Sequence, residues 1–343
     1  MNNTQSSNYI LLRIKIILLL IIKRKINLRK ILNAFNCYFL YFIKSLNSGK
    51  SPVVINIELW NECNESCKFC RTDTGDIYDQ RNSGLNLEKG KLSLEKAIFS
   101  VDSIKNYLLM AIPYINGEPL ISPILIDFLK FCDKNSLATM IATNGIKLDL
   151  NKSQQLLDSN LDVLKVHISG MSNDIHRIEH RTGDVIKILN NIKTFQILNK
   201  KCGNKTLVIL DFIHYLHNSH ELQQAKEFCA KHNLYINIRP GNTNFLDEVS
   251  LQKIKEIPMQ RCDWVYSTMS VDWNGNLLPC CDFATWSKPY IYGNIINDVS
   301  TTPYEIWNDN NSLVSSIRSK HMQGRRSIDV CLKCPKSGIK FKF

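Results

Sequence analysis

The chain has 343 residues, of which 44% are hydrophobic and 22% are charged, and its formal net charge is +12. A chain of this length and hydrophobic content can bury a full core, which excludes a disordered protein and favours one large domain with a smaller one. Residues 1–50 hold nine Lys or Arg and no Asp or Glu, so only +3 of the charge belongs to the remainder. We therefore expect no nucleic-acid-binding surface on the body of the fold.

The N-terminal segment, residues 1–52, is basic and amphipathic. Its uninterrupted apolar run, residues 16–22, is far shorter than the roughly 20 residues that a transmembrane helix needs, so we expect no membrane span. A signal peptide is disfavoured because no small-residue cleavage site follows. With a second apolar stretch at residues 35–43, two interpretations stay open with equal weight. The segment either lies as basic helices on an anionic membrane surface or packs on the protein's own body.

From residue 53 onward, strand-like runs alternate with helix-like runs, which indicates a parallel α/β architecture. Ser122 and Pro123 predict the start of one intervening helix, and Asn218 or Ser219 predicts the start of another. Six β/α units can form an open doubly wound sheet or a partial barrel, and periodicity alone does not choose between them. The strands are expected near residues 53–59, 107–115, 138–143, 161–168, 206–213 and 234–239.

Three of the 12 cysteines share one loop directly after the first expected strand: Cys63, Cys67 and Cys70. A [4Fe-4S] cluster normally takes four cysteine ligands, so three leave one iron open to a ligand that is not protein. Structural zinc is the alternative, but it requires four ligands, usually in two close pairs, and this loop offers no local fourth. Because seven cysteines fall in two ligand-like sets, we expect metal binding in a reducing cytoplasm rather than disulfides.

The spacing of these three cysteines, with Phe69 before the third, resembles the cluster loop of radical S-adenosylmethionine (SAM) enzymes. The resemblance implies a partial (β/α)6 TIM-like barrel over residues 53–250. It also implies a [4Fe-4S] cluster on Cys63, Cys67 and Cys70 that binds SAM through its open iron, and an electron donor such as flavodoxin or ferredoxin. In barrels of this kind the catalytic and ligand-binding residues lie at the carboxyl ends of the strands.

A motif after the second strand supports the same resemblance. Asn116-Gly117-Glu118-Pro119 is similar to the family's Gly-Gly-Glu-Pro motif, with Asn in place of the first Gly. The resemblance implies contact with the ammonium group of SAM, with Glu118 as acceptor and Gly117 allowing the backbone to approach. Residues 143–145, Thr-Asn-Gly, are also usual in the family, although such a turn can occur without chemistry.

The fourth strand ends in Ser169-Gly170, similar to the family's Ser-Leu-Asp-Gly type sequence without its acidic residue. The resemblance implies that Ser169 contacts the carboxylate or ribose of SAM. It also implies that Arg181, ahead of the next helix, pairs with the same carboxylate. The alternative for Arg181 is a solvated surface position.

A second set of cysteines lies beyond the expected barrel, in residues 251–343. Twelve residues separate Cys262 from Gly275 and four separate Gly275 from Cys280, a spacing that resembles the SPASM/twitch extension. The resemblance implies one auxiliary [4Fe-4S] cluster, and a zinc ribbon is the alternative because two of the cysteines form a C-x2-C pair. Its expected ligands are Cys262, Cys280, Cys331 and Cys334.

Local sequence signals predict a hairpin and a helix in this C-terminal region. Asn274-Gly275 predicts a type I′ hairpin that presents Cys280 at its far end. Thr302 and Glu305 predict a capping box that starts a helix leading back to Cys331. Cys281 stays open as a bystander, a substitute ligand or a hydrogen donor, and the remaining cysteines are expected to be ordinary small apolar residues: Cys37, Cys132, Cys202 and Cys229.

The resemblance implies reductive cleavage of SAM and abstraction of a substrate hydrogen. Our first hypothesis is oxidation or epimerisation of a polar small molecule, such as a sugar or cyclitol, in glycoconjugate or natural-product biosynthesis. The second is a maturase that modifies a ribosomal peptide or protein, and the third is a non-catalytic iron-sulfur protein. Asp211, His214 and Arg239 are the catalytic candidates, unless they only stabilise the barrel mouth. We expect a cytoplasmic enzyme, with membrane contact at the inner face through residues 1–50.

Overall fold

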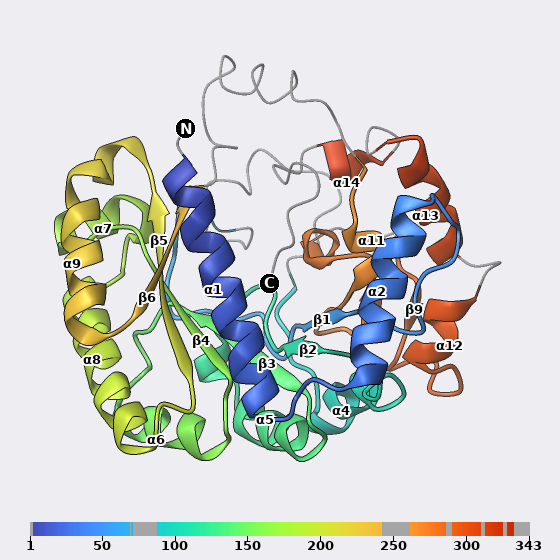
Figure 1. Cartoon of the computed structure of the whole chain (residues 1–343), viewed down its shortest axis with the longest axis horizontal. Coiled ribbons are helices and arrows are strands. Elements are labelled where there is room, and N and C mark those ends of the chain that lie inside the picture. The colour runs from blue at the N-terminus through green and yellow to red at the C-terminus, as the bar shows by residue number, and fades with distance from the viewer. Residues whose placement is uncertain are drawn as a thin grey trace. The chain divides into compact units, whose positions relative to one another are not determined.

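The computed structural model describes residues 3–68, 70, 88–241, 261–285, 290–309, 313–324 and 328–332. The chain divides into two compact units that interleave along the sequence (Figure 1). The first comprises Met1–Lys25, Glu62–Tyr78 and Gly117–Thr243. The second comprises Ile26–Asn61, Asp79–Asn116 and Asn244–Phe343.

The first unit is built on four parallel strands, which pair in the order in which they occur. Because parallel neighbours need long crossovers, helices connect them. The strands are β3 (Ala138–Thr143), β4 (Val163–Ile168), β5 (Leu207–His214) and β6 (Tyr235–Pro240). The helical segments are η1 (Pro119–Ile121), α5 (Leu125–Lys134), α6 (Leu150–Asp158), α7 (Asn173–His180), α8 (Val185–Lys201), η2 (Leu216–Glu221) and α9 (Leu222–His232).

The two faces of these strands differ because successive side chains point to opposite sides. On β4, Leu164, Val166 and Ile168 are fully buried, as expected for the face of a parallel sheet that helices cover. Lys165 and His167 alternate with them and are partly exposed. Lys165 and His167 therefore bring polar groups to the other face of β4, where His167 pairs in register with Asp211 of β5.

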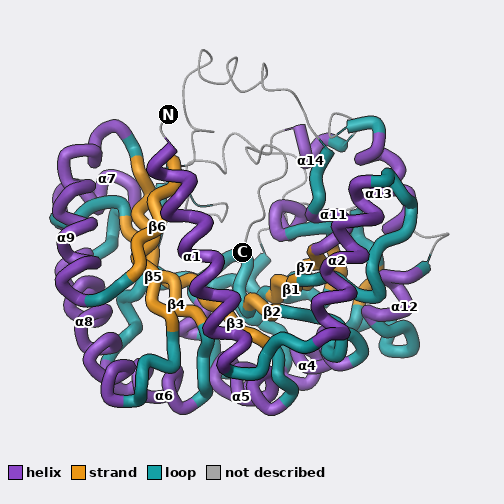
Figure 2. Tube along the Cα trace, in the orientation of Figure 1, coloured by secondary structure: helices purple, strands orange, loops and turns teal. Residues whose placement is uncertain are grey.

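The N-terminal helix α1 (Asn3–Ile22) packs on the first unit, where it contacts β6 (Figures 1 and 2). Its buried stripe consists of Leu12, Ile16 and Leu20, which follow one another at four-residue spacing and so lie on one face of the helix. Beyond its end, Lys23 Nζ lies 2.6 Å from Asp162 Oδ1, and Lys25 Nζ lies 2.6 Å from Asp133 Oδ1. The interpretation that the N-terminal segment packs on the protein's own body thus holds for the inner face of α1.

None of the described helices combines the length and the apolar character needed to cross a bilayer. This agrees with the short apolar run that the sequence shows.

The second unit contains a parallel arrangement in which β1 pairs with both β2 and β7, followed by the antiparallel strands β8 and β9. Their bounds are β1 (Val54–Ile57), β2 (Met110–Ile112), β7 (Thr268–Val271), β8 (Asn276–Leu278) and β9 (Gly293–Asn294). The helical segments are α2 (Leu28–Phe42), α4 (Leu94–Asp102), α11 (Trp264–Ser267), η3 (Cys281–Thr285), α12 (Pro303–Asn308), α13 (Leu313–Met322) and α14 (Asp329–Leu332).

The hairpin predicted around Gly275 is present between β7 and β8, but its turn type was predicted wrongly. Gly275 N donates to Asp272 O at 2.9 Å, and Gly275 has a φ of 77°, whereas Asn274 is not among the residues with positive φ. A type I′ turn needs positive φ at both central residues. The Asp272 carboxylate explains the difference, because it accepts hydrogen bonds from the backbone N–H groups of Asn274 and Asn276.

The other local predictions vary in accuracy. All six expected strands are present, and the capping box is confirmed, since Thr302 Oγ1 accepts from Glu305 N and Thr302 N donates to Glu305 Oε2. The helix predicted to start at Ser122 begins at Leu125, because Ser122 instead caps the C-terminal end of the short η1 segment. Likewise, the helix predicted to start near residue 218 begins at Leu222, after η2. The fold class is confirmed as mixed α/β with parallel strands.

Candidate functional site

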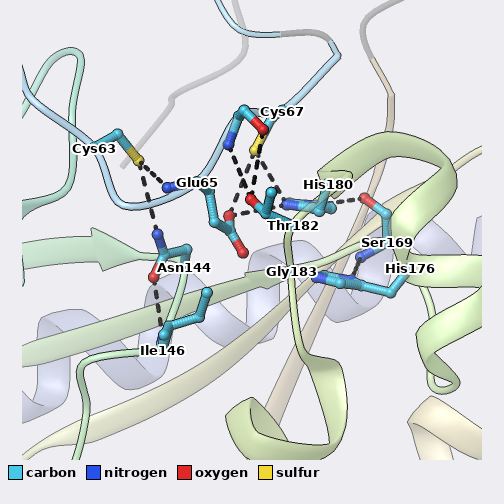
Figure 3. Close-up of polar contacts among 12 residues, drawn as sticks. Cys63, Glu65, Cys67, Asn144, Ile146, Ser169, His176, His180, Thr182 and Gly183 are labelled. Atoms are coloured by element: carbon cyan, nitrogen blue, oxygen red, sulfur yellow. Dashed lines mark hydrogen bonds and ion pairs between the residues drawn. The ribbon is translucent and has the colours of Figure 1, made fainter. Parts of the chain in front are cut away.

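The three cysteines predicted to hold the first cluster lie in a loop of the first unit, and Figure 3 shows two of them, Cys63 and Cys67. The loop is fixed to the end of α7: Lys68 N donates to Glu179 O at 2.8 Å, and Ser66 N donates to Thr182 Oγ1 at 3.3 Å. Within the loop, Cys70 N donates to Cys67 O at 3.1 Å. These bonds fix the part of the loop that carries Cys67 and Cys70, and all three cysteines are partly buried.

Nitrogen donors surround the sulfur of Cys63. Glu65 N lies 3.4 Å from it, and Asn144 Nδ2, from the residue after β3, lies 3.8 Å from it. Asn144 Nδ2 also donates to Asn64 Oδ1 at 3.1 Å. Because N–H groups stabilise a thiolate, this environment suits a metal-bound sulfur.

Burial raises the pKa of Cys63 to about 12, and it raises the pKa of Cys67 as well. A buried thiolate needs a compensating positive charge, which bound iron supplies. The residues therefore fit an iron-sulfur cluster: the three sulfurs come from one turn, and N–H groups are directed at one of them.

A histidine and a glutamate that the sequence analysis missed lie beside Cys67. His180 Nδ1 lies 3.4 Å from Cys67 Sγ and 3.3 Å from Glu65 Oε2. Burial raises the pKa of Glu65 to about 7 and lowers the pKa of His180 to about 3. His176 and His180 are four residues apart on one helix, so their side chains lie on the same face. This spacing is the sequence signal from which the pair could have been identified.

The same histidine reaches the end of β4. His180 Nε2 lies 2.9 Å from Ser169 Oγ, and Ser169 N donates to His176 Nδ1 at 3.2 Å. The two histidine rings stack with their centroids 4.1 Å apart. A Cβ atom on Gly183 would lie 2.7 Å from His176 Nε2, so only glycine allows this close packing. The structure thus brings Ser169 into contact with the cysteine loop through His180 (Figure 3).

Arg181, by contrast, is exposed and ends α7 with a φ of 42°. It follows His180 directly, so the backbone turns outward immediately after the residue that contacts Cys67. Its predicted pairing with the carboxylate of SAM stays a prediction.

Glu118 of the Gly-Glu-Pro motif is buried, and its carboxylate accepts hydrogen bonds within the chain. The donors are Leu120 N at 2.9 Å, Thr143 Oγ1 at 2.6 Å and Asn144 N at 2.8 Å. Burial raises the pKa of Glu118 to about 7. Glu118 therefore fixes the end of β3, including Asn144, whose side chain reaches Cys63.

The two residues before Glu118 differ in their surroundings. Gly117 has a φ of 74°, a conformation that glycine adopts without strain. Asn116 belongs to the second unit, where its backbone N and its Nδ2 both donate to Glu58 Oε1, at 3.1 and 2.8 Å. Glu58 also accepts from Trp273 N at 3.2 Å, so this buried glutamate connects the ends of β1, β2 and β7.

Two of the three catalytic candidates, Asp211 and Arg239, meet beside Lys165 and His167 of β4. Arg239 Nε lies 2.6 Å from Asp211 Oδ2, and Asn237 Nδ2 donates to Asp211 Oδ1. Lys165 Nζ lies 3.6 Å from Asp211 Oδ1, and His167 Nε2 lies 3.4 Å from Asp211 Oδ2. We call these five residues the Asp211 cluster.

The charges in the Asp211 cluster determine its protonation. Burial alone would raise the pKa of Asp211, but the positive charges of Lys165 and Arg239 outweigh it and hold that pKa below its usual range. Burial lowers the pKa of His167 to about 3. The cluster therefore contains two cations, one anion and a neutral imidazole near neutral pH.

The sequence analysis missed Lys165 and His167, although their alternation on β4 places them on one face. The third catalytic candidate, His214, has a different partner: its Nε2 lies 2.9 Å from Ser219 Oγ, in η2.

The auxiliary cysteines belong to the second unit. Cys331 is buried, and its sulfur lies 3.6 Å from His321 Nε2, a histidine that the sequence analysis missed. Burial raises the pKa of Tyr292; the Arg318 guanidinium opposes this rise, and Cys280 and Cys331 add to it. Cys262 and Cys281 are partly buried. Cys334 lies outside the described residues.

Two family profiles match the chain. The profile of the radical SAM superfamily matches residues 57–228, and that of the SPASM iron-sulfur cluster-binding domain matches residues 262–335. These matches confirm the resemblance expected from the cysteine spacing, together with SAM and iron-sulfur clusters as the classes of cofactor.

Curated relatives share part of the chain. S-adenosylmethionine-dependent nucleotide dehydratases of Flammeovirga pacifica and Lacinutrix mariniflava are each 28% identical, over 42% and 52% of this chain. The radical SAM cyclopropyl synthase TigE of Paramaledivibacter caminithermalis is 28% identical over 46% of this chain. The matches span 48%, 33% and 35% of these relatives, so the chain covers less than half the length of each.

Solved structures share the fold. SuiB of Streptococcus suis bound to the precursor peptide SuiA has a TM-score of 0.60 at 14% identity, covering 82% of this chain and 70% of that one. BtrN in complex with AdoMet and 2-DOIA has a TM-score of 0.50 at 17% identity, covering 81% of this chain and 91% of that one. At these identities the likeness concerns the fold.

Proposed function

Since the chain belongs to the radical SAM superfamily and contains a SPASM domain, we propose that it abstracts a hydrogen atom from a polar small molecule of sugar, cyclitol or nucleotide type. The cluster and SAM, when bound, supply a 5′-deoxyadenosyl radical. Cys63, Cys67 and Cys70 would hold that cluster. The auxiliary cluster would be held by four further cysteines: Cys262, Cys280, Cys331 and Cys334.

The chain's own residues would orient these groups. Asn144 directs an N–H group at the sulfur of Cys63, and Glu118 fixes the backbone of Asn144. His180 connects Cys67 to Ser169, the residue proposed to contact SAM. Asn116, Gly117, Glu118, Ser169 and Arg181 remain the proposed SAM-binding set.

The observation that carries the small-molecule proposal is the Asp211 cluster. Its Lys165 and His167 lie on β4, the strand that ends beside Ser169. Ser169 is two residues beyond His167, or roughly 7 Å along a strand. Lys and Arg side chains bind phosphate and carboxylate groups, so this face suits a hydroxylated substrate that carries an anionic group. Two of the relatives are named for nucleotides, which have both features.

Peptide modification is the second candidate function. TigE is named as a cyclopropyl synthase, and SuiB was solved with a precursor peptide. A non-catalytic iron-sulfur protein is the third candidate, and intact Gly117, Glu118 and Ser169 argue against it.

Two kinds of partner belong to the proposed function: an electron donor and a membrane surface. Reductive cleavage of SAM needs an electron donor, for which flavodoxin or ferredoxin is our proposal. We also propose a cytoplasmic location with membrane contact through residues 1–50, where nine cations occur without an acid.

The test is 5′-deoxyadenosine formation by the anaerobically reconstituted protein with dithionite and SAM. We expect nucleoside triphosphates or sugar phosphates to stimulate it about tenfold or more. Lys165→Ala should abolish the stimulation while leaving the slow substrate-independent cleavage. Stimulation by peptides alone would favour the maturase, and no cleavage under any condition would contradict the enzymatic proposal.

A further inference from the structure

Helix α2 buries several polar side chains against the protein and exposes most of its large apolar side chains. Its buried residues include Lys30, Asn33, Cys37 and Tyr41. Asn33 Nδ2 donates to Ser51 O at 3.0 Å, and Tyr41 OH donates to Arg261 O at 3.3 Å. A Cβ on Gly49 would lie 2.6 Å from both Asn33 Oδ1 and Cys37 Sγ, so the inner face is closely packed.

The hydrogen bonds of this inner face fix the rotation of α2 about its axis. Arg261 Nη1 donates to Tyr41 O at 2.8 Å, and the guanidinium lies 4.7 Å from the centroid of the Tyr41 ring. Turning the helix to bury its apolar side would break these hydrogen bonds and leave the polar groups without hydrogen-bond partners. The outward apolar face is therefore built into the fold.

The outward face is one continuous stripe with helical spacing. Its exposed fractions run from 46% to 69%, and the rings of Phe35 and Phe39 stack with centroids 6.0 Å apart. Among the described residues, eight of the 22 exposed large hydrophobic side chains belong to this stripe, and six others lie on α1 in the other unit. The α2 stripe consists of Leu28, Ile31, Leu32, Phe35, Phe39 and Phe42 on the helix, together with Ile43 and Leu46 beyond its last residue.

Apolar patches of this extent mark an interaction site on a soluble protein. Charge indicates the kind of partner. Arg29 and Lys44 are exposed and directly follow Leu28 and Ile43 of the stripe, and no acid occurs in the sequence before Glu58. Cations bordering an apolar helical face complement the anionic headgroups and the acyl chains of a bilayer.

The length of α2 determines its orientation. Its 15 residues extend roughly 22 Å, less than the roughly 30 Å of a hydrocarbon core. An amphipathic helix of this kind lies in the plane of the interface with its apolar side inserted by roughly 5–10 Å.

We propose that α2 is a membrane-docking helix that inserts the stripe into the surface of an anionic bilayer, with Arg29 and Lys44 on the headgroups. This assigns the membrane contact of residues 1–50 to one helix face and does not depend on the substrate. Helix α1 belongs to the other unit, and of the three cations that follow it, Lys23 and Lys25 are engaged with acids of that unit, whereas Arg24 is exposed.

The test is flotation of the reconstituted holoprotein with vesicles of phosphatidylcholine alone or with 30% phosphatidylglycerol. We expect binding to the anionic vesicles only, and about a tenfold or greater loss for Phe35→Asp/Phe39→Asp. A matched control, Ile186→Asp/Ile197→Asp, changes two exposed apolar residues of α8 and should bind as the wild type does. Iron content shows that each variant is folded.

A second variant tests the charge. Arg29→Ala/Lys44→Ala keeps the stripe and should weaken binding about 30-fold, since each cation near the surface contributes about 1 kcal/mol. Absence of vesicle binding by the wild type would overturn the proposal. A wild-type dimer that Phe35→Asp/Phe39→Asp converts to a monomer, without vesicle binding, would overturn it in favour of self-association.

Discussion

The Nδ1 atom of His180 lies 3.4 Å from the sulfur of Cys67. The other nitrogen of the same ring lies 2.9 Å from Ser169 Oγ, so one side chain connects a proposed cluster ligand with a proposed SAM contact. Groups that contact metal ligands in this way orient them and tune the metal. His180 is therefore a positioning residue in our proposal.

Replacing His180 should change the cluster as well as the activity. In His180→Ala the sulfur of Cys67 loses a hydrogen-bond partner, and hydrogen bonds to sulfur help set the potential of a cluster. We expect a more negative midpoint potential, measured by titration followed by electron paramagnetic resonance. SAM cleavage should fall by roughly 10–100-fold.

His180→Asn retains a nitrogen near the position of Nδ1 and should restore part of both values. The control is His232→Ala, in α9 of the same unit, which should match the wild type. An unchanged potential in His180→Ala would show that the histidine has only a structural role.

The two proposed cysteine sets should lose iron independently. The reconstituted wild type should hold about eight irons per chain, as two [4Fe-4S] clusters require. Cys331→Ala should hold about four and retain slow SAM cleavage. Replacing Cys63, Cys67 and Cys70 together should also leave about four irons but abolish cleavage.

Iron and sulfide analysis checks this prediction, with Cys229→Ala as a control that should keep about eight irons. Zinc in place of iron, or the loss of all iron in Cys331→Ala, would contradict the assignment of the auxiliary set.

Glu118→Gln should destabilise the chain. The carboxylate accepts from Leu120 N, Thr143 Oγ1 and Asn144 N, and an amide places an N–H group against one of these donors. An unsatisfied buried donor costs about 1–3 kcal/mol. Anaerobic denaturant unfolding should show a loss of that size. Unchanged stability would contradict this prediction, whereas a raised KM for SAM beside the loss of stability is what the proposed contact with the ammonium group predicts.

Acid should destabilise the fold partly through His176. Burial lowers the pKa of His176 to about 2, whereas in the unfolded chain it is about 6.5. The unfolded state therefore binds a proton that the folded state does not, and the stability contributed above pH 6.5 is lost as the pH falls.

Between pH 7.5 and pH 5.5 this amounts to about 1.4 kcal/mol. His176→Phe keeps an aromatic ring against His180 but cannot titrate. The free energy of unfolding of the wild type should thus fall by about that much more than that of the variant, and parallel curves would contradict the prediction.

Much of the fold could be predicted because its signals are local. The six strands follow from apolar runs, and the Thr302 capping box follows from residues three apart. The turn at Gly275 was placed correctly but given the wrong type, since the side chain of Asp272 competes for the N–H groups of the turn. Residue types and spacing do not reveal which of two local hydrogen-bond patterns is stronger.

The sequence by itself determined the family, through the spacing of Cys63, Cys67 and Cys70 and of the later cysteines, because ligand spacing within a loop is a local property. Only the tertiary structure decided which residues surround those ligands. His180 lies 113 positions after Cys67, and the Asp211 cluster joins three strands. Periodicity shows that α2 is amphipathic, but the partners that bury its polar side, Ser51 and Arg261, meet it only through long-range packing, which is why its apolar stripe faces outward.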